Sequence, residues 1–152
     1  MANFTKVDIL LVEDNFEDAE VTMRALRKNG LTNGLQWVKD GSKAFGALFG
    51  EDAEDGAMVA PRLILLDLRL PKIDGLEVLE RVKCDLRTRH IPVVVLTSST
   101  QDEDIAKSYA LGSNSFVSKP VRFEEFENTV RQLGTYWLVI NKVPDTRAWN
   151  GP

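Results

Sequence analysis

Three short apolar runs constrain the fold of this chain more than any other feature. They occupy residues 7–12, 63–67 and 91–96, and leucine and β-branched residues dominate each of them. Runs of this length and composition are typical of strands that are buried on both faces of a parallel sheet. Two further strand-like segments, at 35–38 and 115–118, bring the expected number of strands to five.

Helical segments separate these expected strands. Apolar stripes and helix-ending glycines predict helices at 16–28, 42–49, 75–86 and 101–111, and a last one that begins near residue 123. Strands that alternate with helices of ten or so residues imply βαβ units, and therefore a parallel sheet with helices on both faces. We expect an α/β fold with a doubly wound, five-stranded parallel sheet.

The composition excludes several classes of function. The chain has 152 residues, of which 43% are hydrophobic and 28% charged, and this fits one domain with a single core. A net charge of −4 argues against direct nucleic-acid binding as the main function. No apolar run approaches the roughly 18 residues that a membrane span needs, and the N-terminus lacks the layout of a signal peptide. We expect a soluble, cytoplasmic protein that contacts no membrane.

Polar side chains end four of the five expected strands. They are Glu13 and Asp14, Asp67, Thr97, and Lys119. Ligands of an open parallel sheet bind outside the carboxyl ends of its strands, where the strand order reverses. Each residue alone has an ordinary explanation: Asp14 fits a helix cap, and a lysine is usually exposed. Together they predict a site, to which the second strand, at the edge, contributes nothing comparable.

Asp67 is central to the chemistry of this expected site. A carboxylate at the end of an apolar run is costly to bury without partners. Three clustered carboxylates repel one another unless a cation or a proton intervenes, and hard oxygen ligands with open positions favour Mg²⁺. Lys119 and Thr97 are then placed to contact a phosphoryl group, and Asp67 is left as the nucleophile that forms an aspartyl phosphate.

These residues resemble the receiver domains of response regulators in two-component signalling. The resemblance spans about residues 7–133 and rests on Glu13-Asp14, on LLDLRLPKIDG around Asp67, on Thr97-Ser98 after VVVL, and on Lys119-Pro120. It implies a flavodoxin-like sheet of strand order 2-1-3-4-5. It also implies that a histidine kinase phosphorylates Asp67. The chain departs from many members of the family in having glutamate at position 13, where they have aspartate.

The resemblance implies a metal site as well. Asp14 and Asp67 would be the direct carboxylate ligands of Mg²⁺. Glu13 and the backbone carbonyl of Arg69 would help to organise the ion, directly or through water. Arg69 and Ser99 also occupy positions that tune the lifetime of the phosphate in relatives.

A switch is implied by the same resemblance. Thr97 and Lys119 would contact the phosphoryl group, and the Lys119–Pro120 peptide bond would be cis. Phe116 matches the aromatic residue that turns inward when the threonine moves. A plain core position for Phe116 is the simpler alternative, and the two are compatible.

The C-terminal segment bears on the output of the protein. We expect a receiver domain at 1–135 and an extension at 136–152, which is too short for a separate output domain. Apolar residues continue into this extension at a/d spacing, namely Phe123, Phe126, Val130, Leu133, Trp137 and Ile140. The first four fit the core face of an ordinary helix. Residues 136–140 form an apolar cluster with little domain left to cover it, which predicts a partner surface.

This extension is similar to that of receivers paired with bacterial phytochromes. The segment YWLVINKVP and the acidic loop at 51–56 are the points of likeness. They imply a phytochrome kinase as candidate partner, and a homodimer formed through the last helix and the extension. For the final residues 145–152, which include Trp149, disorder and contact with a partner both remain open.

Two other interpretations stay open from the sequence. One is a phosphatase with an aspartate nucleophile that acts on a small phosphate ester, although such enzymes carry a second aspartate where Arg69 stands. The other is a receiver that only relays or drains phosphate. Apart from its own phosphoryl uptake and dephosphorylation, we expect no enzymatic activity. The sequence identifies neither the kinase nor the downstream target.

Overall fold

A computed structural model describes residues 4–5, 7–31, 34–51 and 58–144. All of the predicted site residues lie within these ranges. The acidic loop beyond residue 51 and the tail at 145–152, with Trp149, lie outside the described residues.

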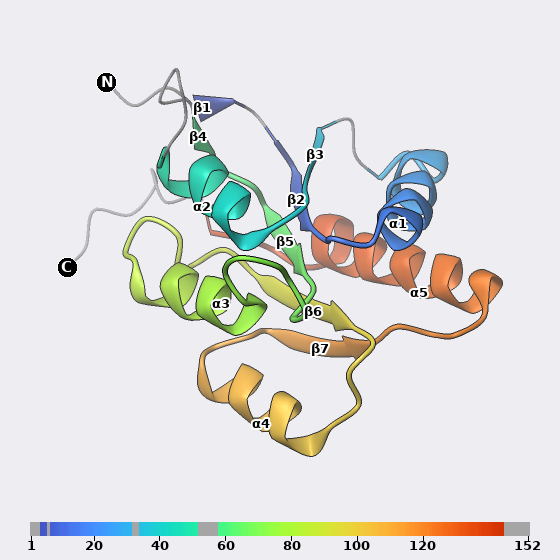
Figure 1. Cartoon of the computed structure of the whole chain (residues 1–152). Coiled ribbons are helices and arrows are strands. Elements are labelled where there is room, and N and C mark those ends of the chain that lie inside the picture. Colours follow the sequence, from blue (N-terminus) through green and yellow to red (C-terminus); the bar gives the residue numbers. More distant parts are fainter. Residues whose placement is uncertain (1–3, 6, 32–33, 52–57, 145–152) are drawn as a thin grey trace.

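A five-stranded parallel sheet forms the middle layer of the fold (Figure 1). Its strands lie in the spatial order β3-β2-β5-β6-β7, with the bounds Leu35–Val38, Ile9–Val12, Leu63–Leu66, Val93–Thr97 and Ser115–Ser118. Counted along the chain among these five strands, this order is 2-1-3-4-5. The predicted doubly wound sheet is therefore confirmed, with β3 as an edge strand.

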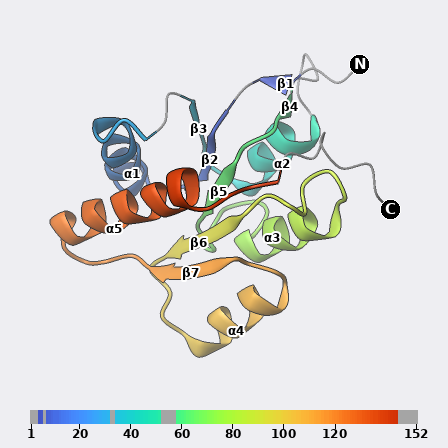
Figure 2. The same cartoon turned by 180° about the vertical axis from the view of Figure 1, so that it is seen from behind.

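Helices cover both faces of this sheet, as the views from the two sides show (Figures 1 and 2). On one face lie α1 (Phe16–Lys28) and α5 (Phe123–Thr135), which pack against each other. On the other face lie α2 (Gly41–Phe49), α3 (Gly75–Cys84) and α4 (Asp102–Ala110). The five helices were predicted from the sequence. The predicted bounds of α1 to α4 and the predicted start of α5 lie within two residues of the observed ones.

A short strand pair lies apart from the main sheet. It joins β1 (Phe4–Thr5) to β4 (Met58–Val59) in parallel. The sequence analysis did not predict this pair, because two residues are too few to show a strand periodicity.

The continuous apolar runs are explained by two separate cores. Successive side chains of a strand point to opposite faces, so a strand covered on both sides is apolar at every position. The core against α2 and α3 contains Leu10, Val12, Ile64 and Leu66. The core against α1 and α5 contains Ile9, Leu11, Leu63 and Leu65.

Asn15 caps the helix that follows the first long strand. Its side-chain oxygen accepts a hydrogen bond from the Asp18 backbone N–H (2.9 Å), as expected for an N-cap residue. The alternative that Asp14 serves as the cap is therefore wrong. The carboxylate of Asp14 is exposed and free for the site at this edge of the sheet.

The chain continues past α5 in a single π-helical turn, η1 (Tyr136–Ile140). Leu138 is buried in the core against α1 and α5, and Trp137 packs on the same core. The Arg62 guanidinium donates a hydrogen bond to the Leu138 carbonyl (2.9 Å). The expectation that little domain is left to cover this segment is thus wrong for its inner side. Its outer side, with Val139 and Ile140, is exposed.

The part of the chain that the structure describes contains no helix with the length and apolar character that crossing a bilayer requires.

We predict that Gly75→Ala lowers the free energy of unfolding by about 1–3 kcal/mol, the usual range for overpacking. A Cβ atom at Gly75 would meet the Asp67 carbonyl oxygen and approach Leu68 Cα to 2.5 Å, and neither main-chain atom can rotate away. Urea denaturation of the purified variant measures the loss.

Gly134→Ala in α5 is the matched control. Its Cβ atom would meet the side-chain ends of Leu26 and Leu31, each at 2.7 Å, and both ends can move. Alanine also favours a helix over glycine by about 1 kcal/mol. Equal losses of stability in the two variants would show that the close approach of main chain at Gly75 is unimportant.

Candidate functional site

The register of the strands brings the predicted site residues to one edge of the sheet. β2 and β5 are paired up to their last residues, so that Glu13 and Asp67 follow side by side. β6 and β7 are paired through Thr97, and Lys119 comes directly after β7. Residues that are up to 106 positions apart in the sequence thus converge, from Glu13 to Lys119.

Lys119 is the cation at the centre of this cluster. Its side chain is only 5% exposed, and its ammonium lies 2.5 Å from Glu13 Oε1 and 2.9 Å from Asp67 Oδ2. A third carboxylate, Asp18 Oδ2 on α1, also lies 2.9 Å away. Asp18 was not among the residues predicted from the sequence. It is one of two acidic residues in the first turn of α1, and no pattern in the sequence distinguishes it from Glu17.

Asp67 has a partner for each of its two carboxylate oxygens. Oδ1 accepts hydrogen bonds from the Thr97 hydroxyl (2.9 Å) and from the Arg69 backbone N–H (3.2 Å). Oδ2 accepts one from the Lys119 ammonium (2.9 Å). The side chain is buried, and these bonds are what makes a charge tolerable at the end of an apolar strand.

The three predicted carboxylates form a cluster with the chemistry of a divalent-cation site. Oxygen atoms of Glu13, Asp14 and Asp67 all lie within 4.8 Å of one another. Glu13 and Asp67 are buried, whereas Asp14 faces solvent and leaves one side open. Hard carboxylate oxygens with open coordination positions suit Mg²⁺ or a similar cation. The residues present therefore fit the metal that the sequence predicts.

The charges of this cluster shift the pKa values of its members. The pKa of Glu13 is raised to about 8, first by burial and then by the neighbouring Asp67, whose effect exceeds the opposing effect of Lys119. Burial also acts to raise the pKa of Asp67. The hydrogen bond with Glu13 and the charge of Lys119 outweigh it, so that the pKa of Asp67 is lowered.

Lys119 responds in the opposite sense. Burial acts to lower its pKa, but Glu13, Asp67 and Asp18 outweigh this effect and raise the pKa above its ordinary value. One ammonium thus faces more carboxylates than it can neutralise, and Glu13 retains a proton instead. A cation bound at this position would take the place of that proton.

Trp37 positions the main chain that carries Glu13. The Trp37 indole N–H donates a hydrogen bond to the Glu13 carbonyl (2.7 Å), and the Phe16 ring lies 5.9 Å from the Trp37 ring. The expectation that the second strand contributes nothing comparable is therefore incomplete, because β3 supplies this contact. A hydrogen bond between residues 24 positions apart leaves no signature in the local sequence pattern.

The Lys119–Pro120 peptide bond is trans, since no cis peptide bond occurs among the described residues. The expectation of a cis bond is wrong. A trans bond before proline is favoured by about 0.5–1 kcal/mol, and Lys119 reaches its three carboxylate partners from the trans geometry.

Phe116 lies on β7 and is half-buried. This burial fits both a core residue and a residue that moves. The switching role stays a prediction.

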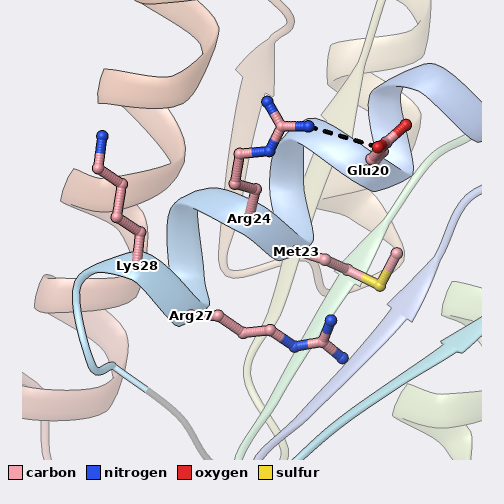
Figure 3. A pocket seen from close by; sticks show the side chains of 5 residues that line it. All are labelled: Glu20, Met23, Arg24, Arg27 and Lys28. Carbon is pink, nitrogen blue, oxygen red and sulfur yellow. Dashed lines mark hydrogen bonds and ion pairs between the residues drawn. The ribbon is translucent and has the colours of Figure 1, made fainter.

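A hollow on the surface of α1 is separate from this site (Figure 3). It is lined by Glu20, Met23, Arg24, Arg27 and Lys28. Arg24 pairs with Glu20 (3.3 Å), and the Lys28 ammonium lies 3.6 Å from Glu127 on α5. Two of its three cations are thus engaged in surface ion pairs of the chain itself, and we assign no binding role to the hollow.

Residues 9–131 match the family model of the response regulator receiver domain. The chain belongs to this family. Receiver domains bind a divalent metal and receive phosphate from histidine kinases, which agrees with the acidic cluster around Asp67.

Two relatives match the chain over most of their own length. It is 46% identical over 136 residues to the probable methanogenesis regulatory protein FilR2 of Methanothrix harundinacea, covering 90% of this chain and 86% of FilR2. It is 35% identical to the response regulator Rcp1 of Synechocystis, covering 90% of this chain and 92% of Rcp1.

Solved structures support the same assignment. The Mn²⁺-bound form of Rcp1 superimposes with a TM-score of 0.85 at 34% identity, covering 91% of this chain and 99% of that one. The phosphorylated cyanobacterial phytochrome response regulator RcpA superimposes with a TM-score of 0.86 at 35% identity, covering 93% and 100%. The chain is therefore similar to phytochrome-associated response regulators.

We predict that the metal-free receiver loses stability as the pH rises from about 5 to 8. The Glu13 carboxyl keeps its proton up to about pH 8 in the folded chain, against an ordinary pKa of 4.5 in the unfolded chain. The folded state then binds the extra proton, so the free energy of unfolding falls by up to about 1.4 kcal/mol per pH unit. Asp67, with its lowered pKa, and Lys119, with its raised pKa, change protonation state outside this pH range.

Urea denaturation at several pH values, with a chelator present, measures this slope. Glu13→Gln keeps the shape of the protonated side chain and is expected to flatten the slope. If unmodified chain and variant show the same pH dependence, Glu13 is not the group that titrates.

Proposed function

We propose that the chain is a phosphoacceptor response regulator that takes a phosphoryl group from a histidine kinase onto Asp67 with Mg²⁺, and signals by protein–protein contact. The observation that carries this proposal is the buried Asp67 carboxylate, held between the Thr97 hydroxyl and the Lys119 ammonium. A nucleophile in this setting is fixed in direction, and the groups that hold it can contact the incoming phosphoryl oxygens.

The transfer is a displacement at phosphorus. An Asp67 oxygen forms the new O–P bond, while the N–P bond to the kinase histidine breaks and its electron pair returns to the imidazole. The Thr97 hydroxyl donates a hydrogen bond to one phosphoryl oxygen, and the Lys119 ammonium pairs with another. Both groups are already within 2.9 Å of Asp67, so little motion is needed to reach the phosphoryl group.

Asp14 and Asp67 are the proposed direct ligands of Mg²⁺, with Glu13 and the Arg69 carbonyl completing the site directly or through water. The oxygen cluster of the three carboxylates supports this assignment. When bound, the cation neutralises negative charge between these carboxylates and the phosphoryl oxygens.

Phosphorylation is proposed to act as a switch through Thr97 and Phe116. The new group carries about −1.5 to −2 charges and competes with Asp67 for the Thr97 hydroxyl. β6 and β7 are paired from Val94–Ser115 to Thr97–Ser118. A movement of Thr97 would therefore also displace β7, the strand that carries Phe116. Half-buried Phe116 can then turn inward.

We predict that acetyl phosphate or a beryllofluoride mimic labels Asp67 in the presence of Mg²⁺. Asp67→Asn is expected to abolish labelling, because the amide removes the nucleophilic oxygen but keeps the shape of the side chain. Mass spectrometry of the intact chain detects the added phosphoryl group.

Asp74→Asn, which changes an exposed aspartate at the start of α3, serves as the control and should label normally. Absence of labelling in the unmodified chain contradicts the phosphoacceptor proposal. Release of alcohol from an added phosphate ester would favour the alternative of an aspartate-nucleophile phosphatase. Transfer of phosphate from Asp67 to a second histidine protein would favour the alternative of a relay or sink.

The phytochrome link of the kinase is part of this proposal. Similarity to Rcp1 and RcpA over at least 90% of the chain supports a phytochrome kinase as the phosphate source. FilR2, another relative, is named for the regulation of methanogenesis and not for a photoreceptor. The chain is proposed to act in the cytoplasm and to catalyse only its own phosphoryl uptake and dephosphorylation.

A homodimer through the last helix and the extension is the proposed output form. A groove of about 400 Å³ lies between β7, α5 and η1, and it is lined by Val117, Leu133, Tyr136 and Trp137 among others. Tyr136, Val139 and Ile140 expose 47–61% of their surface beside it. Apolar side chains gathered at one place on a surface favour contact with another protein.

We predict that Ile140→Glu converts the dimer to a monomer. Ile140 is 61% exposed, so the variant removes an apolar contact between subunits without opening the core. Trp137→Ala tests the same surface but also removes packing on the core against α1 and α5. Size-exclusion chromatography with light scattering measures the mass.

Leu86→Glu is the control, because Leu86 is 74% exposed and follows α3 on the other face of the sheet. An unchanged mass of the Ile140→Glu variant would remove the extension from the dimer interface.

A further inference from the structure

Asp104 on α4 binds two residues that flank the proposed phosphoacceptor. Its Oδ2 lies 3.3 Å from the Arg69 guanidinium and accepts a hydrogen bond from the Ser99 hydroxyl (2.5 Å). Its side chain is 18% exposed, whereas that of Arg69 is 67% exposed. Nothing in the sequence pattern pointed to Asp104, which reads as one of three acidic residues in the first turn of a helix.

Both partners of Asp104 are linked to Asp67. The Arg69 backbone N–H donates to Asp67 Oδ1 (3.2 Å). The Ser99 backbone N–H donates to the Thr97 hydroxyl oxygen (3.4 Å), and that hydroxyl donates to the same Asp67 oxygen (2.9 Å). Asp104 thus joins α4 to both sides of the site through side chains of the loops after β5 and β6.

The carboxylate of Asp104 has two electrostatic effects on a phosphoryl donor. It adds a negative charge at the edge of a site that already holds three carboxylates. It also holds the guanidinium of Arg69, which is the kind of group that pairs best with phosphate oxygens. Small phosphoryl donors such as acetyl phosphate are anions, so both effects oppose their approach.

We propose that Asp104 is a positioning residue that holds Arg69 away from the phosphoryl position and thereby slows phosphorylation by small anionic donors. This inference rests on the proposed phosphorylation of Asp67. Arg69 is the exposed member of this pair, so a bound phosphoryl group can compete with Asp104 for its guanidinium. Asp104 then restrains the reaction with free acyl phosphates more than the reaction with a docked kinase, whose histidine is positioned by protein contacts.

The test is the rate of labelling of the full chain by acetyl phosphate with Mg²⁺. Asp104→Asn is expected to label about three- to tenfold faster, because the variant removes a charge near the donor and releases Arg69. Asp104→Glu, which keeps the charge, should restore slow labelling. The gain should shrink as the salt concentration rises, because it arises from screened charges.

A double-mutant cycle separates positioning from a structural role. In an Arg69→Gln background, Asp104→Asn should increase the rate of labelling much less than it does in the unmodified chain. A gain of the same size in both backgrounds would overturn the proposal, since Asp104 would then not act through Arg69. Unchanged labelling by Asp104→Asn would overturn it as well.

Glu103→Gln is the matched control. Glu103 is the neighbouring carboxylate on α4, and it pairs with Lys107 (2.7 Å). The same gain in Glu103→Gln as in Asp104→Asn would show that overall charge is responsible and would also overturn the proposal. If the unmodified chain is not labelled at all, the phosphoacceptor function itself is refuted. If it is labelled normally and the Asp104 variant changes nothing, only the proposed role of Asp104 is refuted.

Discussion

Asp67 follows a strand whose four residues are all buried, and the residue itself is only 6% exposed. A carboxylate in this position destabilises the fold unless its charge is matched by donors that are fixed in place. Lys119 and Thr97 supply them, each from the end of another strand. The strand order, the parallel register and the crossover helices together keep these groups within hydrogen-bonding distance, so the chemistry of the site depends on the architecture of the whole sheet.

The same charges explain why the site suits a divalent cation and a phosphoryl group. Lys119 meets three carboxylates, namely those of Glu13, Asp18 and Asp67. The excess negative charge is met by a proton on Glu13, whose pKa is raised to about 8 mainly by burial. A bound cation can replace this proton. The positive charge of the cation would also offset the negative charge that a phosphoryl group brings to the site.

Two surface regions of the protein, one at α4 and one at the end of α5, differ in which of their side chains are engaged by the domain itself. On the side of α4, Asp104 pairs with Arg69, which follows the proposed phosphoacceptor by two residues. At the far end of α5, Leu138 is buried by the domain itself, while Ile140 on the same turn is exposed. Leu138 contacts Arg62 just before β5, whereas Asp67 follows β5, so the proposed dimer surface and the proposed phosphoacceptor lie at opposite ends of this strand.

The sequence by itself determined the sheet, its helices and the strand-end residues such as Asp67 and Lys119, because apolar periodicity and the polar ends of buried strands are local patterns. Only the tertiary structure decided which side chains from other elements complete the site. Asp18, Trp37 and Asp104 contact residues 101, 24 and 35 positions away, respectively. Such contacts depend on how helices and loops pack over the sheet, and no local pattern specifies that packing.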